Sequence, residues 1–329
     1  MSYFVKVERD SVNRAGDRLV SFLIRFPRVV LAEILTHRRT SETWGDASLC
    51  ERSASPEISK NSASSRAIPF RRMVDSVKAG PYVPKWTLQE KGMQGAAMSD
   101  ADGLRFADET WLAALDSNAV YAERLHDMGV HKQDCNRLLE PWAWVTQLVT
   151  SSSWDNFFAL RCHRAAFPPF RKLARMMFLA MRASKPVPLY HKQWHLPFVP
   201  VEEQMRFEWE PPIGDLLHGN AKLPDLIRKS AARCAWLSYE NHEKDATDEA
   251  HFKTFDRLLA EVPVHASPAE HQATPMQLPW TAAFPQLRSN LPGWLQARKL
   301  IPFECVKRYE PSEEEIATWD DVDVNPSCP

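Results

Sequence analysis

The chain has 329 residues, of which 44% are hydrophobic and 25% charged, and its formal net charge at pH 7 is −1. These values are typical of a globular protein and argue against a disordered chain or a strongly basic nucleic-acid or membrane binder. Only ten of the 329 residues are glycine, which is well below the usual share of ~7%. No G-x-G-x-x-G or G-x-x-x-x-G-K-[ST] motif occurs, so a Rossmann fingerprint and a P-loop are excluded. Side chains must therefore hold the phosphates of any bound nucleotide.

The six cysteines are widely spaced and include no C-x-x-C pair. This spacing argues against a zinc ribbon, a redox pair and a disulfide framework. The first ten residues, MSYFVKVERD, carry charges too early for a signal peptide, and no stretch approaches the length of about 18 apolar residues that a membrane span needs. We therefore expect a reduced, cytoplasmic protein with no membrane partner.

The first predicted element is a β-hairpin over residues 3–26, where β-branched and aromatic residues flank the turn-like segment SVNRAGD. Pro27 suits the first turn of a helix that continues through RVVLAEILTHRR. Glu33 and His37 lie four residues apart in this segment and would share a helix face. The polar stretch from 40 to 56 is predicted to be a long loop.

The rest of the chain is mostly predicted to be helical, and we expect an α+β fold, rich in helices with a small antiparallel sheet, in a single domain over 1–329. The proline-rich stretch 186–200 is a candidate extended connector between two halves, and 271–278 is a candidate strand. The predicted helices cover residues 68–80, 101–128, 131–149, 166–184, 221–240, 247–261 and 290–300.

The densest polar cluster joins Thr36-His37-Arg38-Arg39 to the Ser- and Asn-rich segment 59–66. Arginine forks and serine hydroxyls suit a bound phosphate or another small anion. The same residues would also fit a basic helix C-terminus followed by a solvated loop. A second cluster places Asn136-Arg137 with the stretch 154–161, where Phe157 would frame Arg161 on one helix face. The alternative is an ordinary surface arginine that packs on its own helix.

A third cluster, His265-Ala266-Ser267-Pro268-Ala269-Glu270-His271, has the composition of a metal site. Its two histidines are not at H-E-x-x-H spacing, so no metal is predicted. The segment Trp194-His195-Leu196-Pro197 is interpreted as an aromatic anchor of the core. No G-x-S-x-G motif or local cysteine signature indicates a nucleophile.

Taken together, these stretches resemble the flavin-dependent thymidylate synthase family, whose hallmark is R-H-R-x-x-S-x-N-x-x-S-x-R. Thr36-His37-Arg38 followed by Ser59-x-Asn61-x-x-Ser64-x-Arg66 matches this motif apart from its first arginine and an insertion. The resemblance is to the long branch found in phage and bacterial genomes. It rests on six stretches in order, at residues 60–69, 130–142, 154–161, 194–198, 231–239 and 265–273.

The resemblance implies reductive methylation of dUMP to dTMP. Methylenetetrahydrofolate would supply the carbon, and FAD, reduced by NADPH, the hydride. The cofactor carries the difficult chemistry while the protein binds and orients the reactants, which fits the missing nucleophile. The resemblance also implies a flavin-dependent thymidylate synthase-like fold, circularly permuted or rearranged, and a homotetramer whose sites combine several subunits.

The resemblance further assigns roles to individual residues. Arg161 matches the catalytic arginine that lies against the pyrimidine, where a fixed cation favours ionisation at N3. Arg66, Arg137, Ser64 and Glu33 match substrate-facing positions. The positions implied to contact the flavin or lie at its entrance are His37, Arg38, Ser62, Thr150, Ser152, Asn156, His265 and Ser267.

The chain departs from the family pattern in several places. Thr36 replaces the first arginine of the motif, and residues 41–58 are inserted within it. Phe167 and Pro169 stand where the family often has Gln and Glu. These last changes leave open another pyrimidine nucleotide, such as dCMP, as the substrate. A non-catalytic nucleotide- or nucleic-acid-binding protein is the remaining alternative, which the near-neutral charge argues against.

Overall fold

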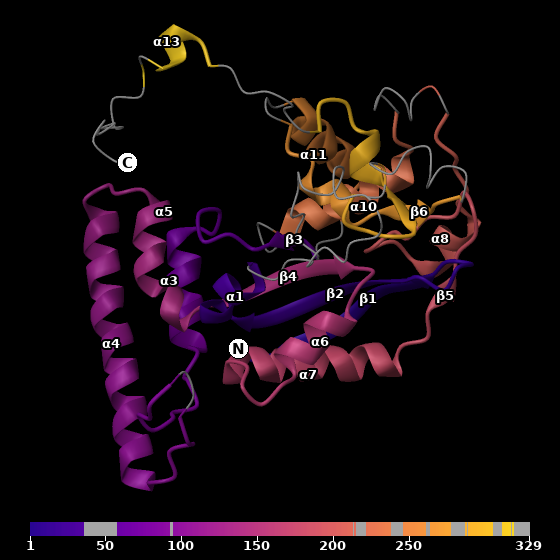
Figure 1. Cartoon of the computed structure of the whole chain (residues 1–329). Helices are drawn as coiled ribbons and strands as arrows, with labels where there is room; N and C mark the ends of the chain where they lie inside the picture. The colour runs from indigo at the N-terminus through magenta and orange to yellow at the C-terminus, as the bar shows by residue number, and fades with distance from the viewer. Residues whose placement is uncertain are drawn as a thin grey trace.

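A five-stranded sheet forms the centre of the computed structural model (Figure 1). Its strand order is β3-β4-β2-β1-β5. Neighbouring strands are antiparallel except β1 and β5, which are parallel. The strands are β1 (Phe4–Val12), β2 (Arg18–Pro27), β3 (Ser59–Ser62), β4 (Trp144–Ser151) and β5 (Val187–Pro188). The predicted α+β class is confirmed, with one parallel pair in the sheet.

The structure describes most of the chain. The described residues are 1–35, 58–92, 95–212, 214, 222–237, 246–260, 264–277, 287, 289–304, 311–316 and 318.

β2 lies between β1 and β4 and is buried along nearly its whole length. Its sequence RLVSFLIRFP is a nearly continuous apolar run, as expected for a strand that is covered on both faces. Val20, Phe22, Ile24 and Phe26 alternate along it and point into one core cluster, because successive strand residues face opposite sides. The predicted hairpin is therefore confirmed.

Two helical layers cover the two faces of the sheet (Figure 1). On one face, α6 (Asp155–Arg161) and α7 (Pro168–Ala183) pack against the even-numbered residues of β2. On the other face, Leu23 and Leu148 pack against Cys234 and Leu237, at the end of α10 (Asp225–Trp236). The amphipathic pattern that predicted a helix over 166–184 is thus satisfied by burial against the sheet.

A separate group of helices packs beside one end of the sheet (Figure 1). It contains α3 (Phe70–Ala79), α4 (Ala101–Asp127), α5 (Lys132–Cys135) and the 3₁₀ helix η2 (Asn136–Trp142). The helices predicted over 68–80 and 101–128 correspond to α3 and α4. Asp100 caps α4 by accepting a hydrogen bond from the Gly103 amide at 2.6 Å, as its position before the helix predicts.

The C-terminal half adds a third core cluster, to which the buried side chains of Trp194 and Leu196 belong. The interpretation of this segment as a core anchor is confirmed. β6 and β7 pair with each other in a two-stranded sheet. The elements of this half are α8 (Val201–Arg206), α10, α11 (Asp248–Ala260), η4 (Ser267–Glu270), β6 (Ala273–Pro275), β7 (Trp294–Gln296), η6 (Ala297–Leu300) and α13 (Glu313–Ile316).

Two helix predictions are wrong, and the sheet explains both. The helix predicted over 131–149 stops within η2, which contains Pro141, and residues 144–151 form β4. The segment WVTQLVTS pairs with β2 on one side and β3 on the other, so tertiary pairing overrides its helical spacing. The helix predicted over 290–300 is β7 followed by η6.

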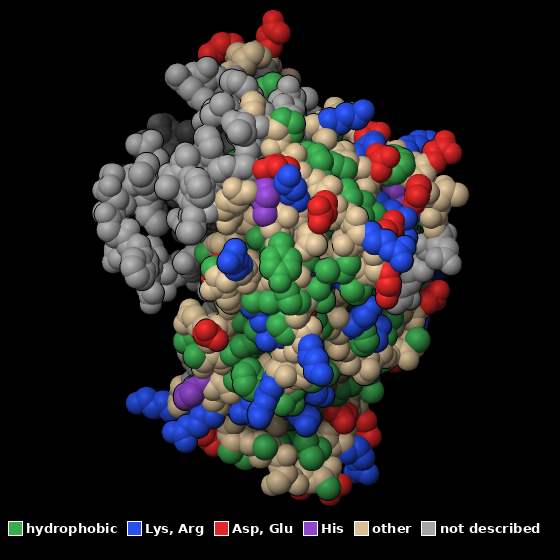
Figure 2. All heavy atoms as spheres, turned by 90° about the vertical axis from the view of Figure 1, so that its right-hand side faces the viewer, with side chains coloured by type: hydrophobic (Ala, Val, Ile, Leu, Met, Phe, Trp, Pro, Cys, Tyr) green, Lys and Arg blue, Asp and Glu red, His purple; other side chains and the backbone are tan. Residues whose placement is uncertain are grey.

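None of the helices described is long and apolar enough to cross a membrane. On the face seen in Figure 2, basic and acidic side chains are both spread over the described surface, with apolar side chains between them. This mixture agrees with the formal net charge of −1.

Candidate functional site

The turn that carries Ser64 and Arg66 is held in place by its own backbone carbonyls. The carbonyl oxygen of Ser64 accepts hydrogen bonds from the amides of Ala67, at 2.9 Å, and Ile68, at 3.2 Å. The side-chain amide of Asn136, which is fully buried at the start of η2, donates to the carbonyls of Ser65, at 2.7 Å, and Ile68, at 3.0 Å. Asn136 therefore joins this turn to η2.

A second network, of hydrogen bonds and an ion pair, supports the same turn through Ser65. The hydroxyl of Ser65 donates to the carboxylate of Glu140 at 2.6 Å. The guanidinium of Arg28 lies 3.0 Å from the same carboxylate oxygen and donates to the Ser65 hydroxyl at 3.3 Å. Charge-assisted bonds of this kind are stronger than neutral ones, so the turn is preorganised.

The turn and η2 present two guanidinium groups on adjacent segments, because Arg66 follows Ser65 and Arg137 follows Asn136. Both side chains are exposed. Neither has a side-chain hydrogen bond or ion pair with another residue that the structure describes. Two cations on this platform, formed by the turn and η2, have no counterion in the described part of the chain and suit a dianion such as a phosphate.

Arg161, the last residue of α6, contacts Glu33 of α1 (Leu31–Leu35). Its guanidinium lies 3.4 Å from the Glu33 carboxylate, and the two side chains are 22% and 39% exposed. The guanidinium also lies over the Phe170 ring, 5.0 Å from its centroid. The expectation that Phe157 frames Arg161 is wrong, because Phe157 points into the core under the sheet. The Nε atom of Arg161 is buried with no hydrogen-bond partner among the described residues.

The four residues implied to contact the flavin on and after β3 and β4 differ in how free their polar atoms are. Ser62 accepts a hydrogen bond from the side-chain amide of Gln147 on β4. Thr150 is fully buried and bonded on both sides. The hydroxyl of Ser152 is buried with no partner in the part of the chain described, and Asn156 is exposed on α6. Ser152 and Asn156 are thus the two of these four that have unused polar groups.

A buried chain of hydrogen bonds links both halves of the protein through Thr150. Ser11 bonds His195 Nδ1 at 2.9 Å, His195 Nε2 bonds Ser21 at 2.8 Å, Ser21 bonds Thr150 at 2.6 Å, and Thr150 bonds His271 Nδ1 at 2.8 Å. All five side chains are fully buried. Burial lowers the pKa of His271 to about 3 and holds the pKa of His195 well below its usual range. Both imidazoles are therefore neutral at pH 7.

Local sequence patterns do not reveal this series of hydrogen bonds, because the bonded residues lie 121 to 184 positions apart. His271 was part of the cluster with metal-site composition, and its contacts explain it as a buried structural residue. The residues that the structure describes contain no group of three or more His, Cys, Asp or Glu side chains that could hold a metal ion.

The 3₁₀ helix η4, which begins at Ser267, lies at the edge of the sheet. This helix packs against β3, which carries Ser62. Ser267 and His265 are both exposed. The structure thus brings together two stretches implied to contact the flavin, although they lie far apart in the sequence. It joins neither Arg66 nor Arg137 to Arg161 by a hydrogen bond or ion pair within the described residues.

Two residues implied to contact the flavin, His37 and Arg38, lie outside the described residues. The same holds for Thr36 and for the insertion at 41–58 except Ile58.

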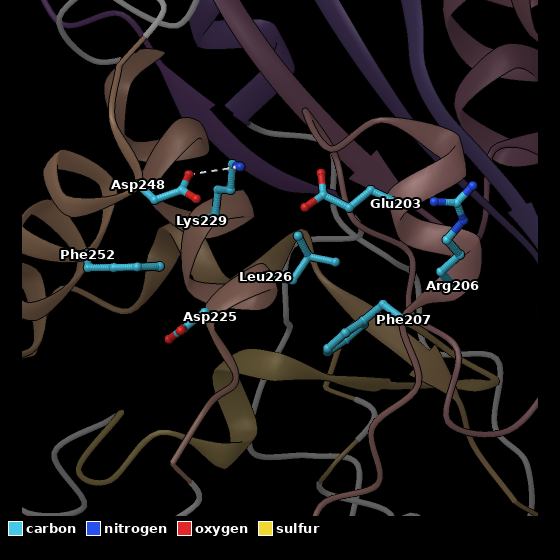
Figure 3. Close-up of a pocket in the computed structure, with 8 residues that line it drawn as sticks. All are labelled: Glu203, Arg206, Phe207, Asp225, Leu226, Lys229, Asp248 and Phe252. Atoms are coloured by element: carbon cyan, nitrogen blue, oxygen red, sulfur yellow. Dashed lines mark ion pairs between the residues drawn. The ribbon is translucent and has the colours of Figure 1, made fainter.

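A surface hollow of about 410 Å³ lies between α8, α10 and α11, away from these residues. Figure 3 shows Phe252 and Phe207 on opposite sides of it, with Leu226 between them. The ammonium group of Lys229, which lines the hollow, forms an ion pair with Asp248 at 2.8 Å. None of the predicted site residues lines this hollow.

Comparison with known proteins gives a match over the first half of the chain. A family model described as "Thymidylate synthase complementing protein" matches residues 19–187. No curated protein matches the chain.

Among solved structures, two of the UMP/dUMP methylase PolB from Streptomyces cacaoi are similar to the chain. The structure with bound 5-Br dUMP is 17% identical with a TM-score of 0.36, over 50% of this chain and 65% of its own. The structure with bound 5-Br UMP is 15% identical with a TM-score of 0.41, over 54% of this chain and 88% of its own. The chain therefore spans less than two thirds of the length of the first of these structures.

Proposed function

The chain belongs to the thymidylate synthase complementing protein family, and we propose that it is a flavin-dependent thymidylate synthase. It would methylate dUMP to dTMP with methylenetetrahydrofolate as the carbon donor and NADPH as the reductant of FAD. The proposal rests on the platform formed by the Ser64–Ile68 turn and η2, which Asn136 joins and which presents Arg66 and Arg137 within the matched range. Neither arginine has a counterion among the residues that the structure describes.

On this proposal, Arg66 and Arg137 bind the nucleotide phosphate. A phosphate that approaches them displaces none of the described residues, so the full charge-assisted interaction contributes to binding. Ser64 lies in the same turn and adds a hydroxyl. Because Asn136 and Glu140 fix the turn before the substrate arrives, little conformational entropy is lost on binding.

Arg161 would act on the pyrimidine ring. Its guanidinium is held by the Glu33 carboxylate and the Phe170 ring, while its buried Nε still lacks an acceptor among described residues. A pyrimidine oxygen would supply that acceptor. A cation fixed against the ring favours the anionic form of its N3–H group, which increases the electron density at the carbon to be methylated.

Some described residues fit a bound FAD. Ser152 after β4 has a hydroxyl with no partner among the described residues, and Asn156 on α6 is exposed. Ser267 and His265, at and before the start of η4, are also exposed and offer further donors and acceptors. Thr150 fits less well as a direct contact, because its hydroxyl already bonds Ser21 and His271. When bound, FAD would supply the hydride that completes the methyl group. The protein would bind and orient the reactants around it.

Exposed apolar side chains on α6 and α7 support the proposal that the protein is a homotetramer. Leu160, Phe167, Phe178 and Leu179 are all exposed to solvent in the single chain, and exposed apolar groups of this size mark subunit contacts in many proteins. Light scattering coupled to size exclusion would give the assembly mass directly. A monomer at micromolar concentration would contradict this part of the proposal.

A second candidate is the same chemistry on another pyrimidine nucleotide. The observation that favours it is the start of α7, where Phe167 and Pro169 stand close in sequence to Phe170, the ring under Arg161. Parallel turnover assays with dUMP, UMP and dCMP separate the two candidates. A dCMP rate above the dUMP rate would favour the second, and preference for dUMP would end it.

The proposal as a whole is tested by the absorption spectrum and product of the purified protein. Flavin bands in the visible spectrum and dTMP formed from dUMP would support it. Protein that stays colourless after incubation with FAD would contradict it. A salt-sensitive gel shift with nucleic acid and no bound flavin would favour the non-catalytic alternative.

A further inference from the structure

The C-terminal segment after residue 187, outside the range that matches the family model, holds η4 against the sheet. η4 begins at the exposed Ser267 and contains two buried residues, Pro268 and Ala269. It ends at Glu270, whose carboxylate accepts a hydrogen bond from the guanidinium of Arg298 in η6. One end of η4 is thus exposed, while its other end is anchored.

The anchor is a partly buried ion network, in which Arg298 is 27% exposed and Glu270 is 18% exposed. Arg298 also donates to the Glu304 carboxylate at 2.7 Å and to the Glu304 carbonyl at 3.0 Å. Lys299 pairs with the same carboxylate. Burial raises the pKa of the Glu270 carboxyl, and the Arg298 guanidinium opposes this shift. A buried carboxylate without its cation is strongly unfavourable, so Glu270 and Arg298 depend on each other.

A side-chain amide completes the anchor by joining η4 to β3. Gln296, which is fully buried at the end of β7, donates to the Glu270 carbonyl at 2.8 Å and to the Asn290 side chain at 3.1 Å. Ser59, the first residue of β3, bonds the Asn290 side-chain oxygen and accepts from its amide group at 3.1 Å. The pairing of β6 with β7 sets Ala273 opposite Gln296, which brings Glu270 and Arg298 to the same end of that small sheet.

We propose that Arg298 is a positioning residue of the flavin site, which acts through Glu270 to hold Ser267 and His265 at the β3 edge. The inference rests on the proposed function, because it takes FAD as the ligand at that edge. It assigns part of the flavin-binding wall to a segment that the family model does not cover.

The test compares Arg298→Met with a matched control, Arg228→Met. Arg228 is also mostly buried and also pairs with two carboxylates, Asp225 at 2.9 Å and Asp256 at 2.7 Å. It lies on α10 and stacks on Phe252 of α11, so its loss disturbs a different part of the fold. Similar melting temperatures for the two variants would show that their structural costs are comparable.

Two measurements are made on each protein. In the absence of FAD, hydrogen exchange is followed at the Ala269 amide, which bonds the Ala266 carbonyl at 3.0 Å. We expect exchange to be faster by at least about tenfold in Arg298→Met and unchanged in Arg228→Met. FAD titration should give a Kd at least about tenfold higher in Arg298→Met only.

The double variant Arg298→Met/Glu270→Gln distinguishes positioning from general destabilisation. Removing both charges should raise the melting temperature above that of Arg298→Met, because no buried carboxylate is left unpaired. The FAD Kd should stay high, because η4 is still not held. Recovery of FAD binding together with stability would overturn the inference.

The inference would also be overturned if Arg298→Met kept the hydrogen exchange and the FAD Kd of the wild type. Changes of the same size in Arg228→Met would overturn it as well. If the wild-type protein binds no FAD, the proposed flavin function fails and the flavin role of η4 fails with it. The exchange measurement, which needs no FAD, separately decides whether Arg298 holds η4.

Discussion

The guanidinium of Arg161 lies 3.4 Å from the carboxylate of Glu33, and the two residues come from helices on either side of a long stretch of sequence. The contact orients a cation whose Nε still lacks a partner among described residues. An arginine so held can interact with a substrate without first being reorganised, which is the condition for electrostatic stabilisation of a transition state.

Replacing Arg161 by methionine should reduce kcat/KM for dUMP by at least ~10²-fold, the usual loss for a group that stabilises developing charge. Steady-state kinetics with saturating FAD would measure the change. Arg175→Met is the control, because Arg175 is exposed on α7 and, among the described residues, donates only to the Cys162 carbonyl. Equal effects of the two substitutions would exclude a special role for Arg161.

Replacing Arg66 or Arg137 by alanine should raise KM for dUMP roughly 10- to 100-fold, the loss of one charge-assisted bond of about 1.5–3 kcal/mol. The value of kcat should change little, because phosphate contacts are equally strong in the ground and transition states. Arg71→Ala on α3 provides the control, since Arg71 pairs loosely with Asp127 at 3.7 Å. An unchanged KM for dUMP in both variants would show that Arg66 and Arg137 do not bind the phosphate.

Two hydroxyl deletions in neighbouring positions should have opposite consequences. Ser152→Ala should weaken FAD binding with little change in stability, because its hydroxyl has no described protein partner. Thr150→Val should lower the free energy of unfolding by about 1–3 kcal/mol, since it leaves Ser21 and His271 each short of a buried partner. Urea unfolding and FAD titration on both variants check this contrast, and the reverse pattern would contradict it.

The buried histidines should make the protein sensitive to acid. The pKa of His271 is about 3 in the folded state and ~6.5 when unfolded, so the unfolded chain binds more protons. The stability that neutral His271 contributes is therefore present above pH 6.5 and is lost as the pH falls towards 3, by about 1.4 kcal/mol per pH unit. His195, whose pKa is also lowered, adds to this loss.

Comparing wild type with His271→Asn isolates that contribution from the carboxylates that titrate in the same range. Free energies of unfolding measured at pH 7 and pH 5 should differ less in the variant than in the wild type. Parallel pH dependences would show that His271 is not a buried neutral imidazole.

How far the sequence could predict the structure depended on how local the determining contacts are. The hairpin over 3–26 and the helix over 101–128 were predictable, because alternation and a capped helical pattern reside in neighbouring residues. The strand β4 was not predictable in this way, because WVTQLVTS becomes a strand through pairing with β2 and β3, which lie elsewhere in the chain. Pairing with β4 also makes the polar segment 59–62 the strand β3, for which a solvated loop had been one of two alternatives.

The candidate site shows the same division. The resemblance drew attention to Arg66, Arg137 and Arg161, but no local pattern indicated that Asn136 supports the first two or that Phe170 lies under the third. These supporting contacts join residues from separate elements, so only the folded chain reveals them. The roles assigned to the site residues stay predictions until the variants above are measured.

Quantifying dTMP in a reaction of the purified protein with dUMP, methylenetetrahydrofolate, NADPH and FAD tests the proposed function itself. The reaction is repeated with each component omitted in turn, after bound flavin has been stripped from the protein. We predict that dTMP forms in the complete mixture and is lost when FAD, NADPH or the folate is left out. Folded protein that forms no dTMP in the complete mixture, or that forms it equally well without flavin, would contradict the proposed function.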